Sequence, residues 1–172
     1  MQDNTLRETR ELPARVRQAE QGDTAELARL RWMFRVEDQA GCSQSDFCQR
    51  FEAWFLEALA SRQWIVAVTE SGEGSLCGCM YVQCIAKVPS PGQIHRSWGY
   101  VTNAYVEPPY RGKALGRRML DLLIETARLQ ELEFLIVWPS ERAVPFYQRA
   151  GFRPVDQAHA GPDDEPPLEL VL

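Results

Sequence analysis

An apolar segment, a turn of small and basic residues and an amphipathic helical pattern follow one another between residues 98 and 131. The turn reads Arg111-Gly-Lys-Ala-Leu-Gly116. A helix that starts there leaves its first N–H groups without intrahelical acceptors, and its N-terminus carries partial positive charge. The turn also holds four cations, which are Arg111, Lys113, Arg117 and Arg118. This segment therefore predicts a binding site for an anion such as a pyrophosphate.

The same segment constrains the fold. A second apolar stretch at 132–138 follows the helix, and a strand–helix–strand unit over 98–138 predicts two parallel neighbouring strands joined by a right-handed crossover. Hydrophobic periodicity predicts strands at 14–19, 64–69, 76–85, 98–106, 132–138, 152–155 and 168–172, and helices from 23, from 43–45, over 113–131 and over 140–149. We therefore expect an α/β fold with a mixed, mostly antiparallel twisted sheet and helices on both faces.

Local patterns refine these elements. Asp23-Thr-Ala-Glu26 resembles a capping box at a helix start, and Ser71-Gly-Glu-Gly74 is typical of a hairpin turn. The helix after residues 43–45 carries an aromatic stripe that favours core packing over a ligand wall. On the helix at 113–131 we expect these residues to face inward: Leu115, Met119, Leu122, Leu123 and Leu129.

Composition limits the domain organisation and the partners. The chain has 172 residues, for which we expect a polar N-terminal arm over 1–12 and a single domain over 13–172. The formal net charge of −5 argues against nucleic-acid and membrane-surface binding, because such proteins present broad basic faces. The sequence has no long apolar run and no signal-peptide pattern, so we expect a cytoplasmic protein.

The cysteines and histidines do not predict a metal site. No Cys-x-x-Cys pair is present, and His95 and His159 complete no zinc spacing. We expect both histidines in surface loops. The five cysteines are expected to be reduced, buried thiols that pack as small apolar side chains.

Two motifs resemble those of a known family. Val106-Glu-Pro-Pro-Tyr-Arg-Gly-Lys-Ala-Leu-Gly116 resembles the acetyl-CoA signature of the GCN5-related N-acetyltransferases, the GNAT superfamily. Pro145-Phe-Tyr-Gln-Arg-Ala-Gly-Phe152 resembles the second element of that family, and the expected order of elements matches the GNAT-type fold from about residue 13 onward. A phosphate-binding P-loop is the nearest competitor, but Arg117 follows Gly116 where that motif requires lysine.

The resemblance implies a coenzyme site. Backbone N–H groups of residues 112–117 would hold the pyrophosphate of acetyl-CoA, and the main chain at 104–106 would pair with the pantetheine arm and polarise the thioester carbonyl. Tyr147 matches the tyrosine that protonates the leaving thiolate, whereas we expect Phe146 to be a core residue. The implied coenzyme-binding residues are Ala104, Tyr105, Val106, Arg111, Gly112, Lys113, Ala114, Leu115, Gly116, Arg117, Ser140 and Tyr147.

The chain departs from the family pattern at the turn. Ala114 stands where the family most often has glycine. An alanine fits there if it keeps a negative φ, so we expect that conformation.

The chain also departs from the pattern at the general base. Thr102, Asn103 and Leu135 stand where members of the family carry a glutamate, and none of them can accept the proton of an ammonium group. Glu107 is close in sequence but is expected to be a turn residue. The alternatives that stay open are a water molecule held by Thr102 and Asn103, a neutral amine, and a carboxylate from the loop at 37–38.

The resemblance implies an acetyl-CoA-dependent N-acetyltransferase that moves an acetyl group to a primary amine in a ternary complex, without a metal. The acceptor would be a small amine or a peptide terminus, and the protein a monomer or homodimer. The loops near 37–45, 86–97 and 156–167 would select the acceptor, and their acids (Glu37, Asp38, Asp163, Asp164 and Glu165) would suit a cationic amine, although solvated loop charge also explains them. The alternatives are a non-catalytic acyl-CoA-binding or sensing module and transfer of a longer acyl chain.

Overall fold

The computed structural model describes residues 14–93, 96–155 and 166–172. The expected arm at 1–12, both histidines and the acids at 163–165 lie outside these residues. The strands are β1 Arg15–Gln18, β2 Trp64–Glu70, β3 Leu76–Ala86, β4 Ser97–Val106, β5 Phe134–Val137, β6 Arg153–Pro154 and β7 Leu168–Val171. The helices are α1 Thr24–Phe34, α2 Gln44–Ser61, α3 Leu115–Leu129 and α4 Val144–Arg149, with short 3-10 turns at Gln21–Asp23, Val36–Asp38 and Pro108–Tyr110.

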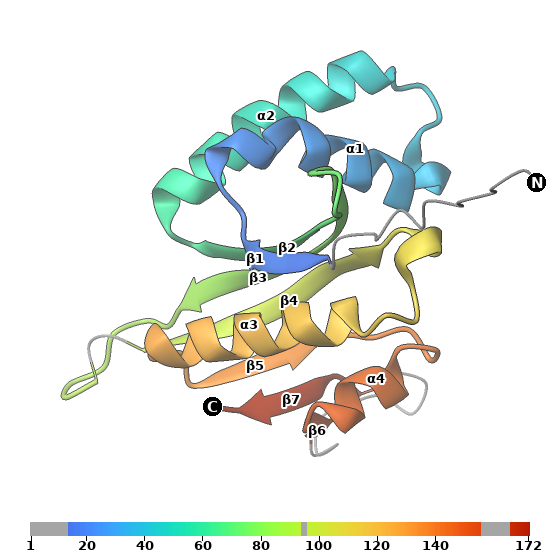
Figure 1. Ribbon diagram of the computed structural model, residues 1–172. Coiled ribbons are helices and arrows are strands. Elements are labelled where there is room, and N and C mark those ends of the chain that lie inside the picture. Colours follow the sequence, from blue (N-terminus) through green and yellow to red (C-terminus); the bar gives the residue numbers. More distant parts are fainter. Residues whose placement is uncertain (1–13, 94–95, 156–165) are drawn as a thin grey trace, which may run out of the picture.

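The described strands form one seven-stranded sheet in the order β1-β2-β3-β4-β5-β7-β6. All neighbours pair antiparallel except β4 and β5, which are parallel and are connected through α3. The mixed, mostly antiparallel sheet and the strand–helix–strand unit over 98–138 are therefore confirmed (Figure 1).

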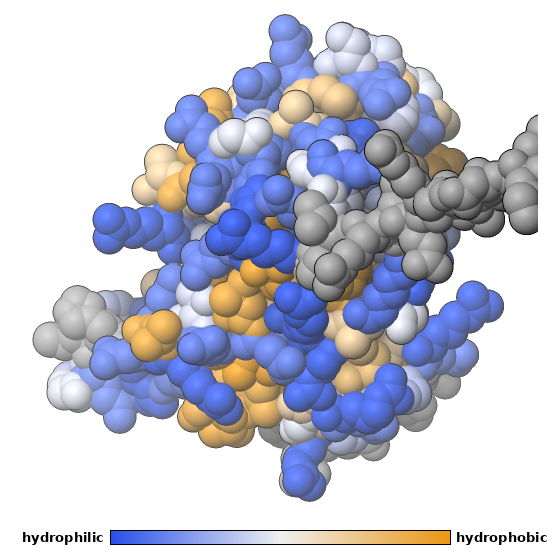
Figure 2. All heavy atoms as spheres, in the orientation of Figure 1, coloured by the Kyte–Doolittle hydropathy of each residue, from blue (hydrophilic) through white to orange (hydrophobic). Residues whose placement is uncertain are grey.

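Helices cover both faces of this sheet. Alternate residues of β2 point to opposite sides, so that Ile65 packs in a core with α3 whereas Val66 packs in a core with α1 and α2. Figure 1 shows α3 in front of the strands and the α1–α2 pair above them. The surface seen in Figure 2 is mainly hydrophilic, with apolar side chains visible between the charged ones.

The inward face of α3 differs in part from the prediction. Leu115, Met119 and Leu123 are buried, but Leu129 is 79% exposed and was wrongly placed. Leu122 is half-buried. At 3.6 residues per turn the buried stripe runs through 119, 120, 123, 124 and 127, and position 129 lies on the opposite side.

The starts of α1 and α2 also differ from each other. The carboxylate of Asp23 does not cap α1; it accepts hydrogen bonds from the Glu20 backbone N–H and from the Arg17 guanidinium at 2.7 to 2.8 Å. The second helix starts within the predicted 43–45, and Ser43 caps it, because its hydroxyl accepts the N–H of Asp46 at 3.1 Å.

The aromatic stripe of α2 is a core element. Phe51 and Phe55 are buried, whereas Trp54 is 38% exposed at the edge of the stripe.

The described cysteines are free thiols. Cys77 and Cys79 are buried as expected. Cys48 and Cys84 are only partly buried and Cys42 is exposed, so the expectation of five buried thiols is wrong at Cys42 and only partly met at Cys48 and Cys84. Within the part of the chain that the structure describes, no helix combines the length and the apolar character needed to cross a membrane.

Candidate active site

The turn between β4 and α3 bends through two residues in the left-handed region. Gly112 has a φ of 76°, and Ala114, the N-cap of α3, has a φ of 57°. The prediction that Ala114 keeps a negative φ is therefore wrong. The turn leads directly into the start of α3, where the first N–H groups lack intrahelical acceptors and favour an anion. An alanine in this conformation costs about 1–2 kcal/mol, so the turn holds local strain.

A cavity of about 380 Å³ opens in front of this turn. Arg111, Gly112, Ala114, Leu115, Gly116 and Arg117 line it from the turn, together with Val106, Tyr110, Phe146 and Arg149. Arg149 was missed at the sequence level, although it lies inside the second motif, two residues after Tyr147. Three arginines therefore line a cavity that is also lined by the N-terminal residues of α3. This combination suits a pyrophosphate.

The four cations of the turn do not all face that cavity. Arg118 donates to the Ala14 carbonyl at 3.0 Å and does not line the cavity. Arg117 is held by Asp121 at 2.8 Å, and Arg111 donates to the Val106 carbonyl at 2.8 Å. Lys113 lies over the ring of Tyr110, 5.4 Å from its centroid. Intramolecular partners thus set the positions of these side chains.

The strands β4 and β5 diverge beside the turn. They pair only at Gly99 with Leu135 and at Tyr100 with Ile136, whereas β4 continues to Val106. Beyond Tyr100, the edge of β4 that faces β5 has no strand partner among the described residues. Its backbone groups are therefore available to a ligand.

A β-bulge interrupts β4 at the point of divergence. Met80 of β3 stands opposite two residues, Asn103 and Ala104, and Asn103 has a φ of 51°. Bulges of this kind bend a strand and turn its side chains to a new direction.

A second cavity of about 470 Å³ occupies the space beside the diverging strands. It shares Val106, Arg111, Gly116 and Phe146 with the first cavity. Its other lining residues are Phe34, Met80, Ala104, Tyr105, Met119, Ser140, Arg142, Ala143 and Tyr147. The two cavities together offer a continuous path from the cationic turn to the unpaired edge of β4. A long ligand with an anionic end and an uncharged arm matches this path.

Tyr147 reaches the second cavity from α4. Its side chain is buried, and its ring lies in edge contact with Phe146 and Phe152. Burial raises the pKa of Tyr147 to about 12, and the neighbouring Tyr100 phenol adds to this shift. The phenol is therefore a proton donor at neutral pH. Phe146, expected in the core, is only partly buried and lines both cavities.

The structure does not bring a carboxylate to the expected base positions. Leu135 is fully buried. Thr102 stands opposite Tyr81 on the face of the sheet that α1 and α2 cover, and the side-chain oxygen of Asn103 accepts a hydrogen bond from Arg31 of α1 at 2.6 Å. These two side chains are on the α1 side of the bulge, while the backbone of Ala104 lines the second cavity.

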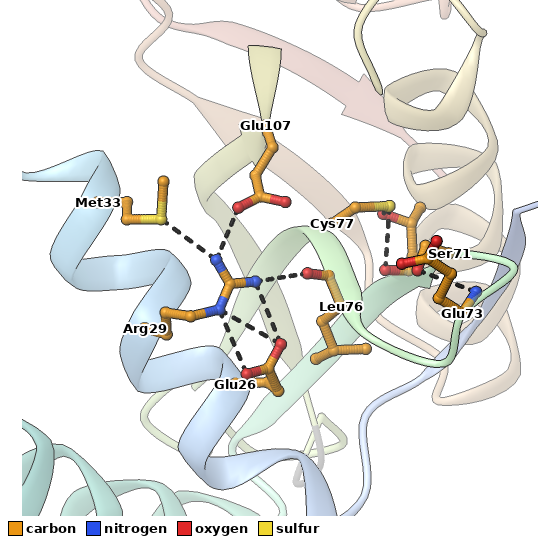
Figure 3. Close-up of polar contacts among 9 residues, drawn as sticks. Glu26, Arg29, Met33, Ser71, Glu73, Leu76, Cys77 and Glu107 are labelled. Atoms are coloured by element: carbon orange, nitrogen blue, oxygen red, sulfur yellow. Dashed lines mark hydrogen bonds and ion pairs between the residues drawn. The ribbon is translucent and has the colours of Figure 1, made fainter. Parts of the chain in front are cut away.

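The remaining acids near the site are held by arginines. Glu107 receives a hydrogen bond from Arg29 at 2.7 Å, and its side chain is 15% exposed (Figure 3). It joins the end of β4 to α1 and does not cap the 3-10 turn that follows. Glu37 and Asp38 are both bound by Arg35 on the surface. Within the described residues, no group of three or more His, Cys, Asp or Glu side chains is arranged to hold a metal ion.

Comparison with known proteins identifies the family. Residues 24–152 match the acetyltransferase (GNAT) family, and the chain belongs to that family. A glucosamine 6-phosphate N-acetyltransferase of Trypanosoma brucei brucei is 36% identical over 58 residues. This match spans 34% of the chain and only 40% of that relative.

Solved structures share the fold. A predicted acetyltransferase with acetyl-CoA from Clostridium acetobutylicum has a TM-score of 0.68 at 22% identity, covering 87% of this chain and 96% of that one. The glucosamine-6-phosphate N-acetyltransferase from Arabidopsis thaliana has a TM-score of 0.67 at 18% identity, covering 89% and 100%. The PaiA N-acetyltransferase from Thermoplasma acidophilum, in complex with coenzyme A, has a TM-score of 0.65 at 12% identity, covering 94% and 100%. The expected family and fold are therefore confirmed: the chain is a member of an acetyltransferase family and has its fold.

Proposed function

We propose that the protein transfers an acetyl group from acetyl-CoA to a primary amine by direct attack in a ternary complex. One observation carries the proposal: the left-handed turn, the unpaired edge of β4 and the Tyr147 phenol border two cavities that share lining residues. The turn and its arginines would hold the pyrophosphate, and the backbone at 104–106 would pair with the pantetheine arm. The complexes of fold relatives with acetyl-CoA and coenzyme A support this assignment of the ligand.

The chain's own groups account for the transfer. The amine nitrogen forms a bond to the thioester carbonyl carbon, and the carbon–sulfur bond breaks. A backbone N–H at 104–106 would stabilise the negative charge on the carbonyl oxygen, and Tyr147 would donate its proton to the leaving sulfur. The proton of the amine would leave to water held by Thr102 and Asn103, or the amine would bind already neutral.

The lining of the cavities favours direct transfer over an acyl-enzyme. The described residues that line both cavities include no cysteine. The nearby Cys79 is buried, and burial raises its pKa to about 12, so it is a poor nucleophile.

An assay of coenzyme A release across a panel of amines tests the proposal. We expect release to require the amine, and initial-rate plots to intersect, as a ternary complex demands. Parallel plots would instead indicate an acyl-enzyme. Binding of acetyl-CoA without turnover on any amine would favour the second candidate, a non-catalytic acyl-CoA-binding module, which the lack of a carboxylate at 102, 103 and 135 supports.

Transfer of a longer acyl chain is tested in the same assay by competition between acetyl-CoA and longer thioesters. A cytoplasmic location, a single domain over 13–172 and a monomeric or homodimeric state stay predictions from the sequence.

A further inference from the structure

Arg31 occupies the wall between α1 and the bulge of β4. Its Nη1 donates to the side-chain oxygen of Asn103 at 2.6 Å, and its guanidinium lies 5.9 Å from the centre of the Phe34 ring. Phe34 lines the second cavity and packs on Tyr105, which lines it too. Arg31 itself is half-buried and lines a smaller cavity of about 110 Å³ between α1 and α2. It adjoins the second cavity on the α1 side of the sheet through Phe34, which lines that cavity, and through Asn103, which precedes the lining residue Ala104.

The charge of Arg31 has no counterion among the described residues. Arg17, Arg29 and Arg35 each bind a carboxylate, but the hydrogen bond of Arg31 goes to a neutral amide. Asp38, which lines the same small cavity as Arg31, is bound by Arg35. Desolvation lowers the pKa of Arg31, and repulsion from Arg35 lowers it further. A half-buried cation without a carboxylate partner is unusual, because removing a charge from water costs free energy unless the charge is paired.

The polar neighbours of Arg31 cannot supply that partner. Burial raises the pKa of the Cys79 thiol to about 12, and it raises the pKa of the Tyr81 phenol well above its ordinary value. Both groups are therefore neutral where Arg31 is charged. The Tyr81 hydroxyl is also buried without a hydrogen-bond partner in the described part of the chain. Among the described residues, Asp38 attracts Arg31 electrostatically, but its recorded ion pair is with Arg35 and not with Arg31.

We infer that Arg31 binds an anionic group of the acceptor, so that the amine substrate also carries a carboxylate or a phosphate. This inference rests on the proposed acetyl transfer. A guanidinium has several N–H donors in a planar fork that matches either anion, and Asn103 occupies only one side of it. The expectation of a cationic acceptor finds no support at Glu37 and Asp38, because Arg35 neutralises both acids.

Paired acceptors test the inference in the full-length protein. One pair is phosphoethanolamine and ethanolamine; the other is β-alanine and β-alaninamide. We expect a lower KM for the anionic member of at least one pair. The pair that shows this difference tells whether Arg31 prefers a phosphate or a carboxylate. In Arg31→Gln, KM for that anionic acceptor should rise about 10- to 100-fold, the loss typical of a charge-assisted hydrogen bond. KM for its neutral partner and for acetyl-CoA should change less than about twofold.

Two further variants separate binding from folding. Arg31→Lys keeps the charge and should recover part of the preference for the anionic acceptor. Arg50→Gln removes an exposed arginine of α2 and should leave all the constants unchanged. If Arg31→Gln changes both members of each pair equally, or if wild type shows no preference for anionic acceptors, Arg31 only buttresses the bulge and the inference is wrong.

Failure of the proposed function gives a different result. In that case no amine releases coenzyme A, although acetyl-CoA binds. Calorimetry with the same acceptor pairs, in the presence of coenzyme A, then decides the inference. Binding of an anionic member that Arg31→Gln weakens would support it, and absence of such binding would overturn it.

Discussion

The two sides of the candidate site are built in different ways. The proposed coenzyme region, residues 104–117, is a continuous stretch that would act mainly through backbone groups, at the unpaired edge of β4 and at the start of α3. The proposed acceptor region, which comprises Arg31, Thr102 and Asn103, joins α1 to β4 and would act through side chains. The backbone geometry of the first region can be predicted from a short motif of glycines and a helix start. The side-chain contacts of the second region depend on how α1 packs against β4, which a short motif does not reveal.

The difference also appears in charge. The arginines of the coenzyme region donate to carbonyl groups or to Asp121 and still border a cavity. Arg31 is held by a neutral amide beside two neutral, buried groups. In the first region several arginines are held in place by hydrogen bonds within the protein. In the second region one arginine has a neutral hydrogen-bond partner and no ion pair with a described residue. The following changes test this contrast.

The largest effect on kcat is expected at Tyr147, the side chain proposed to protonate the leaving sulfur of the coenzyme. Tyr147→Phe should lower kcat about 100- to 1000-fold, because the leaving sulfur loses its proton donor. Acetyl-CoA affinity, measured by calorimetry, should stay within about twofold of wild type. An unchanged kcat would remove Tyr147 from the reaction.

The pH profile gives an independent test of the same group. Because the pKa of Tyr147 is raised to about 12, the phenol stays protonated well above neutral pH. We expect no fall in kcat near the ordinary phenol pKa of about 10. A descending limb there that Tyr147→Phe abolishes would contradict the raised pKa.

A carboxylate introduced into the turn at 111–116 should have the next largest effect, on KM for acetyl-CoA. A Cβ at Gly116 would meet the Phe146 ring at an ordinary 3.7 Å, so Gly116→Asp is tolerated sterically but adds a negative charge. We expect KM for acetyl-CoA to rise about 100-fold through repulsion of the pyrophosphate. Gly22→Asp, on an exposed turn, is the matched control. Equal behaviour of the two variants would mean that the pyrophosphate binds elsewhere.

Glu107 lies between the two regions and tests whether an acid there has a chemical role. Glu107→Gln should lower the free energy of unfolding by about 1–3 kcal/mol, because Arg29 loses a charged partner in a partly buried ion pair. We expect kcat to change less than about twofold. Denaturant unfolding and steady-state kinetics measure the two effects, with the exposed Glu57→Gln as control. A large loss of kcat with unchanged stability would instead make Glu107 a general base.

The smallest effect concerns the strained turn itself. Ala114→Gly should raise the melting temperature by about 2–4 °C, because glycine adopts the left-handed conformation without the clash of a Cβ atom. Ala150→Gly, at a right-handed position, should lower it. A lower melting temperature in Ala114→Gly would show that the methyl group contributes packing that outweighs the strain.

Much of the fold was predictable, because it follows from periodicity. The parallel β4–β5 pair, the start of α2 near residue 44 and the hairpin at 71–74 all match the sequence patterns. The errors are local. Leu129 is apolar, but its position in the helical repeat places it on the exposed side of α3. Asp23 binds Arg17 and the preceding turn instead of capping α1.

Less of the candidate site was predictable. The motif located the turn, but it did not reveal the left-handed Ala114, since a methyl group argues against that conformation. Arg149 lies within a quoted motif, yet its approach to the cavity depends on how α4 packs beside α3. Nothing in the sequence pairs Arg31 with Asn103, which are 72 positions apart.

The sequence by itself determined the order of elements, the clustering of cations at the turn and the presence of the Tyr147 motif. These properties depend on residues close together in the chain, where backbone geometry and periodicity act. Only the tertiary structure decided that Arg118 turns away from the cavity, that Glu107 is bound by Arg29, and that Arg31 lacks a counterion. Such properties depend on which side chains meet across α1, β4 and α3, because the energy of a charge is set by its surroundings in space rather than by its neighbours in sequence.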